Sequence, residues 1–232
     1  AASGIWGPRA VDSEYRELRE GLLFCPGAEL ENISDPDAVQ YLDFISRAGI
    51  KRDFTRLQEA YEACGVKVHW LDPRPLLDGR VLDKYNLMYC RDLFFNTRAG
   101  AILARMGSRV RAGEEKFMQL ALARLAVPIN KTIDSDGLFE GADAIWLDPD
   151  TVLCGTGYRT NTAGVSQVKA VMARQGVSTL VVKLPRYVQH LMGVVQLVDR
   201  DLALIRTAIA PASLKRILKD RGFKIIAVPE SP

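Results

Sequence analysis

The stretch AIWLDPDTVLC at residues 144–154 decides the fold of this chain, because it places two apolar segments on either side of a turn centred on Pro149. Short apolar segments flanking a turn rich in Asp and Pro predict a β-hairpin. A helical pattern of apolar residues then begins at Asn161, ends at Gly176 and leads into a third strand at residues 180–182. Together these features predict a strand–turn–strand–helix–strand unit.

The same unit recurs roughly every 50 residues, a period that is typical of repeat architectures. Because helices alternate with strands, the chain is predicted to be α/β. Because one unit cannot bury its apolar face alone, the units are expected to pack around a common axis. The remaining hairpins are predicted at residues 93–103 and 194–205, and the remaining helices at residues 54–61, 117–125 and 214–218.

The first repeat differs from the others. Its helix is predicted to begin at Asp53 as the N-cap and to lead into a strand at residues 66–70. Ahead of that helix the sequence shows only one apolar strand, at residues 22–24. A closed ring requires a partner for this strand and for the one ending at Val228, and we expect no segment of the chain to supply one. The sequence therefore predicts about four repeats in an incomplete ring.

Composition limits the classes of partner. With 48% hydrophobic and 25% charged residues, we expect residues 1–232 to form a single domain with one substantial core. No apolar run approaches the roughly 20 residues of a membrane helix, and residues 1–8 lack the features of a secretory signal. The net charge is +3, and acidic and basic residues are interspersed. We therefore expect neither a membrane nor a nucleic-acid partner.

The cysteines indicate a reduced protein. They have no paired spacing, and each lies in or beside an apolar segment, as a small buried side chain would. Two histidines and no Cys-x-x-Cys pair leave too few ligands for a zinc site. We expect a cytoplasmic protein with no metal and no cofactor. The four cysteines are Cys25, Cys64, Cys90 and Cys154.

Two acidic residues follow apolar segments in neighbouring repeats. Asp92 follows residues 87–89 and Glu140 follows another apolar pair, so each is expected where a strand meets a connection, a common place for functional residues. A guanidinium group offers five donors in fixed directions, and carboxylates bind it through paired hydrogen bonds. The alternative, which such spacing alone favours, is that Asp92 pairs with Arg91 and that Glu140 caps a turn.

Basic residues are candidates to complete such a site. His190 precedes an apolar hairpin, and an imidazole with a pKa of about 6.5 suits a general acid and base, with Glu140 as a residue that could hold it. Arg111 and Arg159 are candidates to bind a substrate carboxylate. The alternatives are a core histidine and two surface arginines, and we assign His69 to the core.

Three short motifs resemble those of the guanidine-modifying enzymes, at residues 90–92 (Cys-Arg-Asp), 139–143 (Phe-Glu-Gly-Ala-Asp) and 190–192 (His-Leu-Met). The stretches 105–108 and 159–161 are similar to the branch that contains dimethylarginine dimethylaminohydrolases and arginine deiminases; amidinotransferases belong to the same superfamily. The resemblance implies the pentein fold, a five-bladed α/β propeller of ββαβ repeats, here incomplete.

The same resemblance implies a role for each candidate residue. Asp92 corresponds to the acid that binds the substrate guanidinium, and Asp143 to a second substrate-binding acid. Glu140 corresponds to the glutamate beside the catalytic histidine, and His190 to that histidine, the general acid and base. The positions that bind the carboxylate of an amino-acid substrate correspond to Arg111 and Arg159.

The mechanism implied by the family needs no cofactor. A cysteine thiolate attacks the guanidinium carbon, and His190 protonates the departing amine and then activates the water that releases a ureido product. Met192 departs from arginine deiminases and amidinotransferases, which usually have an aspartate there. A thioether cannot accept a charged N–H as a carboxylate does, so the change is compatible with an N-substituted guanidine or with an uncharacterised branch. The family nucleophile lies near the C-terminus and is not found in this sequence, where Cys90 is the only local substitute. We therefore expect a longer protein.

The leading hypothesis from the sequence is an amidine hydrolase that acts on arginine or an N-substituted arginine, with a small guanidino compound as its partner. An amidinotransferase is the alternative, in which an amine replaces water. A non-catalytic pentein that binds a guanidine or a protein is the second alternative. The sequence leaves a homodimer open.

Overall fold

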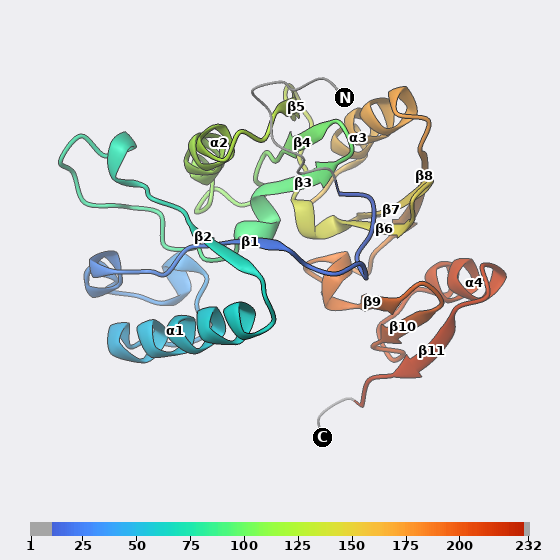
Figure 1. Cartoon of the computed structure of the whole chain (residues 1–232), viewed down its shortest axis with the longest axis horizontal. Helices are drawn as coiled ribbons and strands as arrows, with labels where there is room; N and C mark the ends of the chain where they lie inside the picture. The colour runs from blue at the N-terminus through green and yellow to red at the C-terminus, as the bar shows by residue number, and fades with distance from the viewer. Residues whose placement is uncertain (1–10, 230–232) are drawn as a thin grey trace.

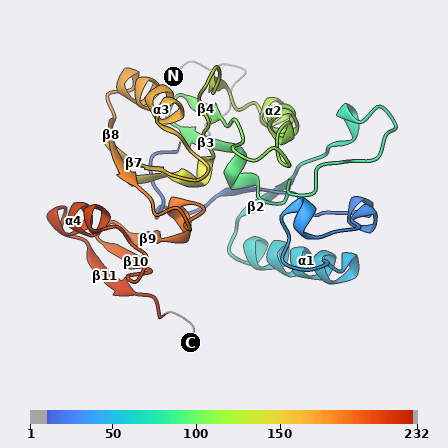
Figure 2. The ribbon, with the colours of Figure 1, turned by 180° about the vertical axis from the view of Figure 1, so that it is seen from behind.

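The computed structural model describes residues 11–229, in which eleven strands form four separate sheets. The sheets follow one another along an arc in chain order (Figure 1). Both views show that this arc is open between the blue-to-cyan first unit and the red last unit (Figure 2). The described residues therefore agree with the predicted incomplete ring.

The elements have the following bounds. The first sheet contains β1 (Glu20–Leu23) and β2 (Lys67–Trp70), and the second contains β3 (Phe94–Thr97), β4 (Gly100–Leu103) and β5 (Ile129–Thr132). The third contains β6 (Ala144–Asp148), β7 (Thr151–Thr156) and β8 (Ser178–Lys183), and the fourth contains β9 (Val195–Asp199), β10 (Leu202–Ile205) and β11 (Lys224–Ala227). The helices are α1 (Arg47–Ala63), α2 (Glu114–Arg124), α3 (Thr162–Arg174) and α4 (Ala212–Asp220).

Each three-stranded sheet has the predicted order. Its first two strands form an antiparallel hairpin, as in the pairing of Ala144 with Cys154 between β6 and β7. A helix follows, and the third strand then returns parallel to the middle one, as in the pairing of Thr151 with Ser178 between β7 and β8. The other two three-stranded sheets have the same order.

The strand expected at residues 22–24 does have a partner, so that prediction was wrong. β1 pairs in parallel with β2, and Leu22 lies opposite His69. Because α1 connects them, β1 and β2 correspond to the middle and last strands of the other units. What this unit lacks among the described residues is the first hairpin strand.

The starts of α3 and α1 show one N-cap prediction that was right and one that was wrong. α3 has Asn161 as its N-cap, as predicted, with the side chain accepting a hydrogen bond from Gly164 N at 2.8 Å. The prediction of Asp53 as the N-cap of α1 was wrong. Ser46 is the N-cap, because its hydroxyl accepts a hydrogen bond from Gly49 N at 3.2 Å and so begins the helix earlier.

The core lies within and between the three-stranded sheets. Trp146 is fully buried and stacks on Phe95 with the ring centroids 5.8 Å apart. α3 buries Val165, Val168 and Met172 against this part of the core. None of the helices in the described part of the chain combines the length and apolar character needed to cross a bilayer.

Three short 3-10 turns stand directly before the first strand of the three-stranded sheets. They are Cys90–Leu93, Gly141–Asp143 and Leu191–Gly193, and we call them the hub turns. Asp92 and Glu140 therefore lie where a connection meets a strand, as expected, but they precede the strand, and residues 87–88 before Asp92 form a turn. The first and third hub turns have one candidate site residue each, Asp92 and His190, and the second has two, Glu140 and Asp143.

Candidate active site

The hub turns bring together three candidate residues from three different repeats. Asp92 lies within the first hub turn, and Glu140 and His190 are the N-caps of the second and third. One ligand atom of each side chain lies within 4.8 Å of the others. Since the turns occupy equivalent positions in their repeats, packing the repeats together also packs these side chains together.

Glu140 and His190 form a close pair. Nε2 of His190 lies 2.7 Å from Oε2 of Glu140, and the glutamate is fully buried. Burial works to raise the pKa of Glu140, but its hydrogen bond with His190 and the charges of Arg111 and Arg159 bring it below the usual value. For His190, burial works to lower the pKa, yet the bond to Glu140 and the nearby Asp92 and Asp143 raise it. The imidazole is thus held as a proton donor.

Asp92 binds a guanidinium group within the protein. Its Oδ2 accepts a hydrogen bond from Nη1 of Arg111 at 2.5 Å, so the expected alternative of a pair with Arg91 is not observed. Arg111 is buried, not on the surface, and its Nε donates to Glu114 at 2.8 Å. Burial raises the pKa of Glu114 to about 7 even though Arg111 is so close. Arg111 also lies 3.9 Å from Glu140.

Arg159 is likewise buried beside the site. Its Nη1 lies 3.5 Å from Oε1 of Glu140, and its Nη2 donates to Oε1 of Gln40 at 3.3 Å. Its Nε is buried and has no hydrogen-bond partner among the described residues. Gln40, which also accepts from Ser108, was missed by the sequence analysis. No local pattern marks Gln40, because it reaches Arg159 across 119 residues of sequence.

Asp143 is fully buried, and its Oδ2 has no hydrogen-bond partner among the described residues. Its Oδ1 accepts a hydrogen bond from the backbone N–H of Leu191 at 2.9 Å. Burial raises the pKa of Asp143 to about 6, although the hydroxyl of Thr160, the charge of His190 and the Leu191 N–H work in the opposite direction. From this position Asp143 ties the second hub turn to the third.

The cysteines near the core are poor nucleophiles. Burial raises the pKa of Cys90 and of Cys154 to about 12. The Cys90 thiol donates to the carbonyl of Leu87 at 3.3 Å, which satisfies it as a structural side chain. Met192, in the third hub turn, is partly buried and packs against the apolar cluster of the last two sheets.

The ligand types of Asp92, Glu140 and His190 would suit a divalent cation. Two neighbouring guanidinium groups argue against a bound metal ion. Arg159 and Arg111 lie 3.5 and 3.9 Å from Glu140, and Arg111 binds Asp92 directly. The two fixed positive charges offset part of the negative charge of the acids, and this weakens the binding of a doubly charged metal ion.

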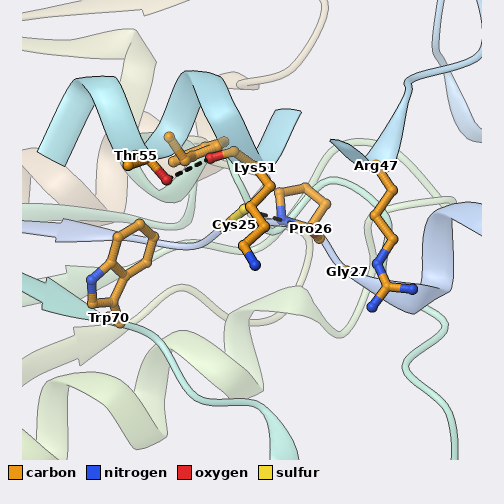
Figure 3. A pocket seen from close by; sticks show the side chains of 8 residues that line it. Cys25, Pro26, Gly27, Arg47, Lys51, Thr55 and Trp70 are labelled. Atoms are coloured by element: carbon orange, nitrogen blue, oxygen red, sulfur yellow. Dashed lines mark hydrogen bonds between the residues drawn. The ribbon is translucent and has the colours of Figure 1, made fainter. Parts of the chain in front are cut away.

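A pocket of about 380 Å³ lies elsewhere, beside α1 (Figure 3). It combines the aromatic Phe54 and Trp70 with the basic Arg47 and Lys51, and Arg47 is already paired with Glu31 at 2.8 Å. None of the candidate site residues lines it. Its lining residues are Cys25, Pro26, Gly27, Arg47, Lys51, Phe54, Thr55 and Trp70.

Comparison with known proteins finds relatives in sequence and in structure. The family model described as arginine deiminase matches residues 80–228. The chain is 26% identical over 171 residues to an N(G),N(G)-dimethylarginine dimethylaminohydrolase from Pseudomonas aeruginosa, which covers 74% of this chain and 62% of that relative. The chain thus spans less than two thirds of that relative's length.

Two solved structures share the fold. A dimethylarginine dimethylaminohydrolase from Pseudomonas aeruginosa, complexed with citrulline, has a TM-score of 0.73 at 22% identity and covers 91% of this chain and 76% of its own. The N-terminal domain of a cyanobacterial arginine dihydrolase, bound to product, has a TM-score of 0.75 at 15% identity over 92% and 76% of the two chains. These likenesses confirm the predicted pentein-type α/β fold.

Proposed function

Because the chain belongs to the arginine deiminase family, we propose that it forms the guanidine-binding part of an amidine hydrolase. The proposed reaction breaks a C–N bond of arginine or of an N-substituted arginine, and it proceeds within a single catalytic domain. The observation that carries the proposal is the convergence of Asp92, Glu140 and His190 from three repeats to within 4.8 Å. Two carboxylates and one imidazole are the groups that binding a flat cation and moving a proton require.

Asp92 is the proposed anchor for the substrate guanidinium. Its contact with Arg111 shows that this carboxylate accepts guanidinium N–H groups at 2.5 Å in its present orientation. Glu140 supplies a second negative charge beside it, and burial strengthens both interactions. A guanidinium held on one side by these acids would leave its trigonal carbon open to attack from the other.

His190 is the proposed general acid and base. Its raised pKa favours the protonated imidazole, which can deliver a proton to the departing amine as the C–N bond breaks. The neutral imidazole then takes a proton from the water that releases the ureido product. The covalent step needs a thiolate on the guanidinium carbon, and the buried Cys90 and Cys154 do not suit it. We propose that residues beyond this sequence supply it.

Arg159 is the better candidate to bind the carboxylate of an amino-acid substrate. Its Nε has no hydrogen-bond partner among residues 11–229, its Nη2 donates to the neutral Gln40, and its guanidinium lies over the ring of Tyr158. Arg111 would first have to leave Asp92 and Glu114. For Asp143 we propose an indirect part in substrate binding, through its bond to the Leu191 N–H.

Met192 supports an N-substituted substrate. It is partly buried and apolar, and it cannot accept a charged N–H as a carboxylate does. The curated relative reported above acts, by its name, on dimethylarginine. We therefore propose that N-methylated arginines bind better than arginine, and that Met192→Asp reverses this preference.

Calorimetric titration of the chain with arginine and with dimethylarginine tests the binding part. We expect Asp92→Asn to weaken guanidine binding by roughly tenfold or more, the scale of a lost charge-assisted hydrogen bond. Asp72→Asn is a matched control, because Asp72 pairs with Arg74 away from the hub turns. Unchanged affinity in Asp92→Asn would reject the proposed anchor. In a longer form of the protein, mass spectrometry should detect a ureido product, and an amine-transfer product instead would indicate a transferase.

A further inference from the structure

Arg91, next to the proposed anchor Asp92, joins two hub turns. Its Nη1 donates to the carbonyl of Gly141 at 2.7 Å, and its Nη2 donates to the carbonyl of Ala144 at 2.8 Å. One planar guanidinium in the first hub turn therefore grips both ends of the second. A lysine could not do this, because it has a single nitrogen and no rigid fork.

The N-terminal segment holds Arg91 in place from the other side. Oε1 of Glu14 lies 3.4 Å from Nη2 of Arg91 and accepts a hydrogen bond from Trp146 N at 3.0 Å. The ring of Phe95 lies under the guanidinium, 5.4 Å from its carbon. The side chain is thus confined by an acid, a ring and two carbonyl groups.

This grip bears directly on Glu140, which precedes Gly141. A Cβ on Gly141 would collide with the carbonyl oxygens of Arg91 and Phe94, so the second hub turn is seated tightly against the first. At its other end, Asp143 accepts the N–H of Leu191 in the third hub turn. The turn that carries Glu140 is therefore fixed on both sides.

We propose that Arg91 is a positioning residue that holds the Glu140 carboxylate against His190, and that Glu14 in turn holds Arg91. This inference deepens the proposed function and rests on it for its meaning in catalysis. The contacts of Arg91 with Glu14, Gly141 and Ala144 join protein atoms only, so they can be tested without a substrate.

The charges around His190 make the proposal testable by the direction in which the pKa of His190 changes. The acids that face the imidazole are Glu140, Asp92 and Asp143, and the two arginines beside Glu140 are Arg111 and Arg159. Removing the positive charge of Arg91 would by itself raise the pKa of His190 slightly. Loss of positioning instead weakens the bond between Glu140 and His190, and this lowers the pKa of His190. The two effects have opposite directions.

The experiment is an NMR pH titration of the imidazole in the 232-residue chain, with His69→Gln as background so that His190 is the single histidine. In the background protein we expect the pKa of His190 to lie above its ordinary value. Arg91→Met should lower it by about one unit, the scale of a weakened ion pair. Arg91→Lys should lower it too, even though the charge is kept.

Arg98→Met is the matched control. Arg98 also pairs with the N-terminal segment, at 3.2 Å from Asp12, and with Asp150 at 3.6 Å, but it contacts no hub turn. We expect no change in the His190 pKa. An unchanged or raised pKa in Arg91→Met, with the near-UV circular dichroism of the parent, overturns the proposal.

If Arg91→Met does not fold, Arg91→Lys decides the question, because it keeps the positive charge and loses only the paired hydrogen bonds to Gly141 and Ala144. A smaller shift in the same downward direction supports the proposal, and no shift overturns it. A lowered pKa in a chain that fails to bind any guanidine would leave the positioning role intact and refute the proposed function instead.

Discussion

The β1–α1–β2 unit and the three units that follow it have the same middle strand, helix and last strand, but they differ in what precedes them. Each later unit begins with a hub turn and a hairpin strand, whereas β1 has neither among the described residues. All three converging site residues lie in or beside hub turns. The proposed site therefore depends on the segment that the first unit lacks.

The helix of the first unit also differs from that of a later unit, in how many of its residues are buried. α3 buries five residues, but α1 buries none, although its pattern of Phe54, Leu57 and Tyr61 is as amphipathic as the others. Phe54 packs on Trp70 at 6.2 Å, and Trp70 is 41% exposed. An apolar stripe predicts a helix, but a second layer of structure is needed to bury it.

The largest effect should come from breaking the core of the later units. Trp146→Ala removes a fully buried ring that stacks on Phe95, and we expect a loss of about 3–5 kcal/mol in the free energy of unfolding. Trp70→Ala, in the first unit, should cost about 1 kcal/mol, because much of the ring is already in water. Urea denaturation measures both. Equal losses would mean that the first unit is as well packed as the others.

Asp143 should give the next largest effect, seen as a dependence on pH. Because burial raises its pKa to about 6, the folded state binds a proton more tightly than the unfolded state, and stability falls as pH rises from about 4 to 6. Asp143→Asn removes this loss, so relative to the parent it should gain about 3 kcal/mol between pH 4 and pH 7. Urea denaturation at the two pH values measures the gain.

Asp72, which follows β2, is the control, because its pKa is shifted in the opposite direction from that of Asp143. Its hydrogen bonds with Arg74 lower its pKa to about 2, so its contribution to stability is present above about pH 4 and is lost only as pH falls toward 2. Asp72→Asn should therefore leave the slope between pH 4 and pH 7 unchanged. A parent slope retained by Asp143→Asn would show that its carboxyl group is not buried as described.

The sequence predicts the repeated unit well because its signals are local. Asn161 stands next to the first helical residue of α3, so the cap and the apolar pattern coincide. For α1 they do not coincide, since the cap Ser46 lies well ahead of the apolar residues that begin at Phe54. The helix was found, but its start was misplaced.

The site was predicted unevenly for a related reason. Spacing alone could not bring Asp92, Glu140 and His190 together, and only the family resemblance did. Arg91 and Gln40 were assigned no role in the site, because their partners are backbone carbonyls or side chains 50 to 119 residues away. Such contacts depend on how repeats pack, and no pattern along the chain encodes them.

The helix caps should give a smaller contrast between the two regions. The Asn161 side chain accepts from Gly164 N and Leu138 N and donates to Asp136 O, so Asn161→Ala should cost about 2 kcal/mol. Ser46→Ala loses one exposed bond and should cost about 0.5 kcal/mol. Thermal unfolding of both variants tests this. The reverse order would mean that α1 contributes more to stability than its exposure suggests.

The smallest effect should come from His69, which pairs with Glu20 between β1 and β2 at 2.5 Å. The pair resembles that of His190 with Glu140 in chemistry, but Glu20 is 38% exposed while Glu140 is fully buried. Exposed ion pairs contribute little, so His69→Gln should change the free energy of unfolding by about 0.5 kcal/mol or less. A loss of several kcal/mol would place His69 among the structural residues of the core. A small change is the result expected of an ion pair whose glutamate stays in contact with water.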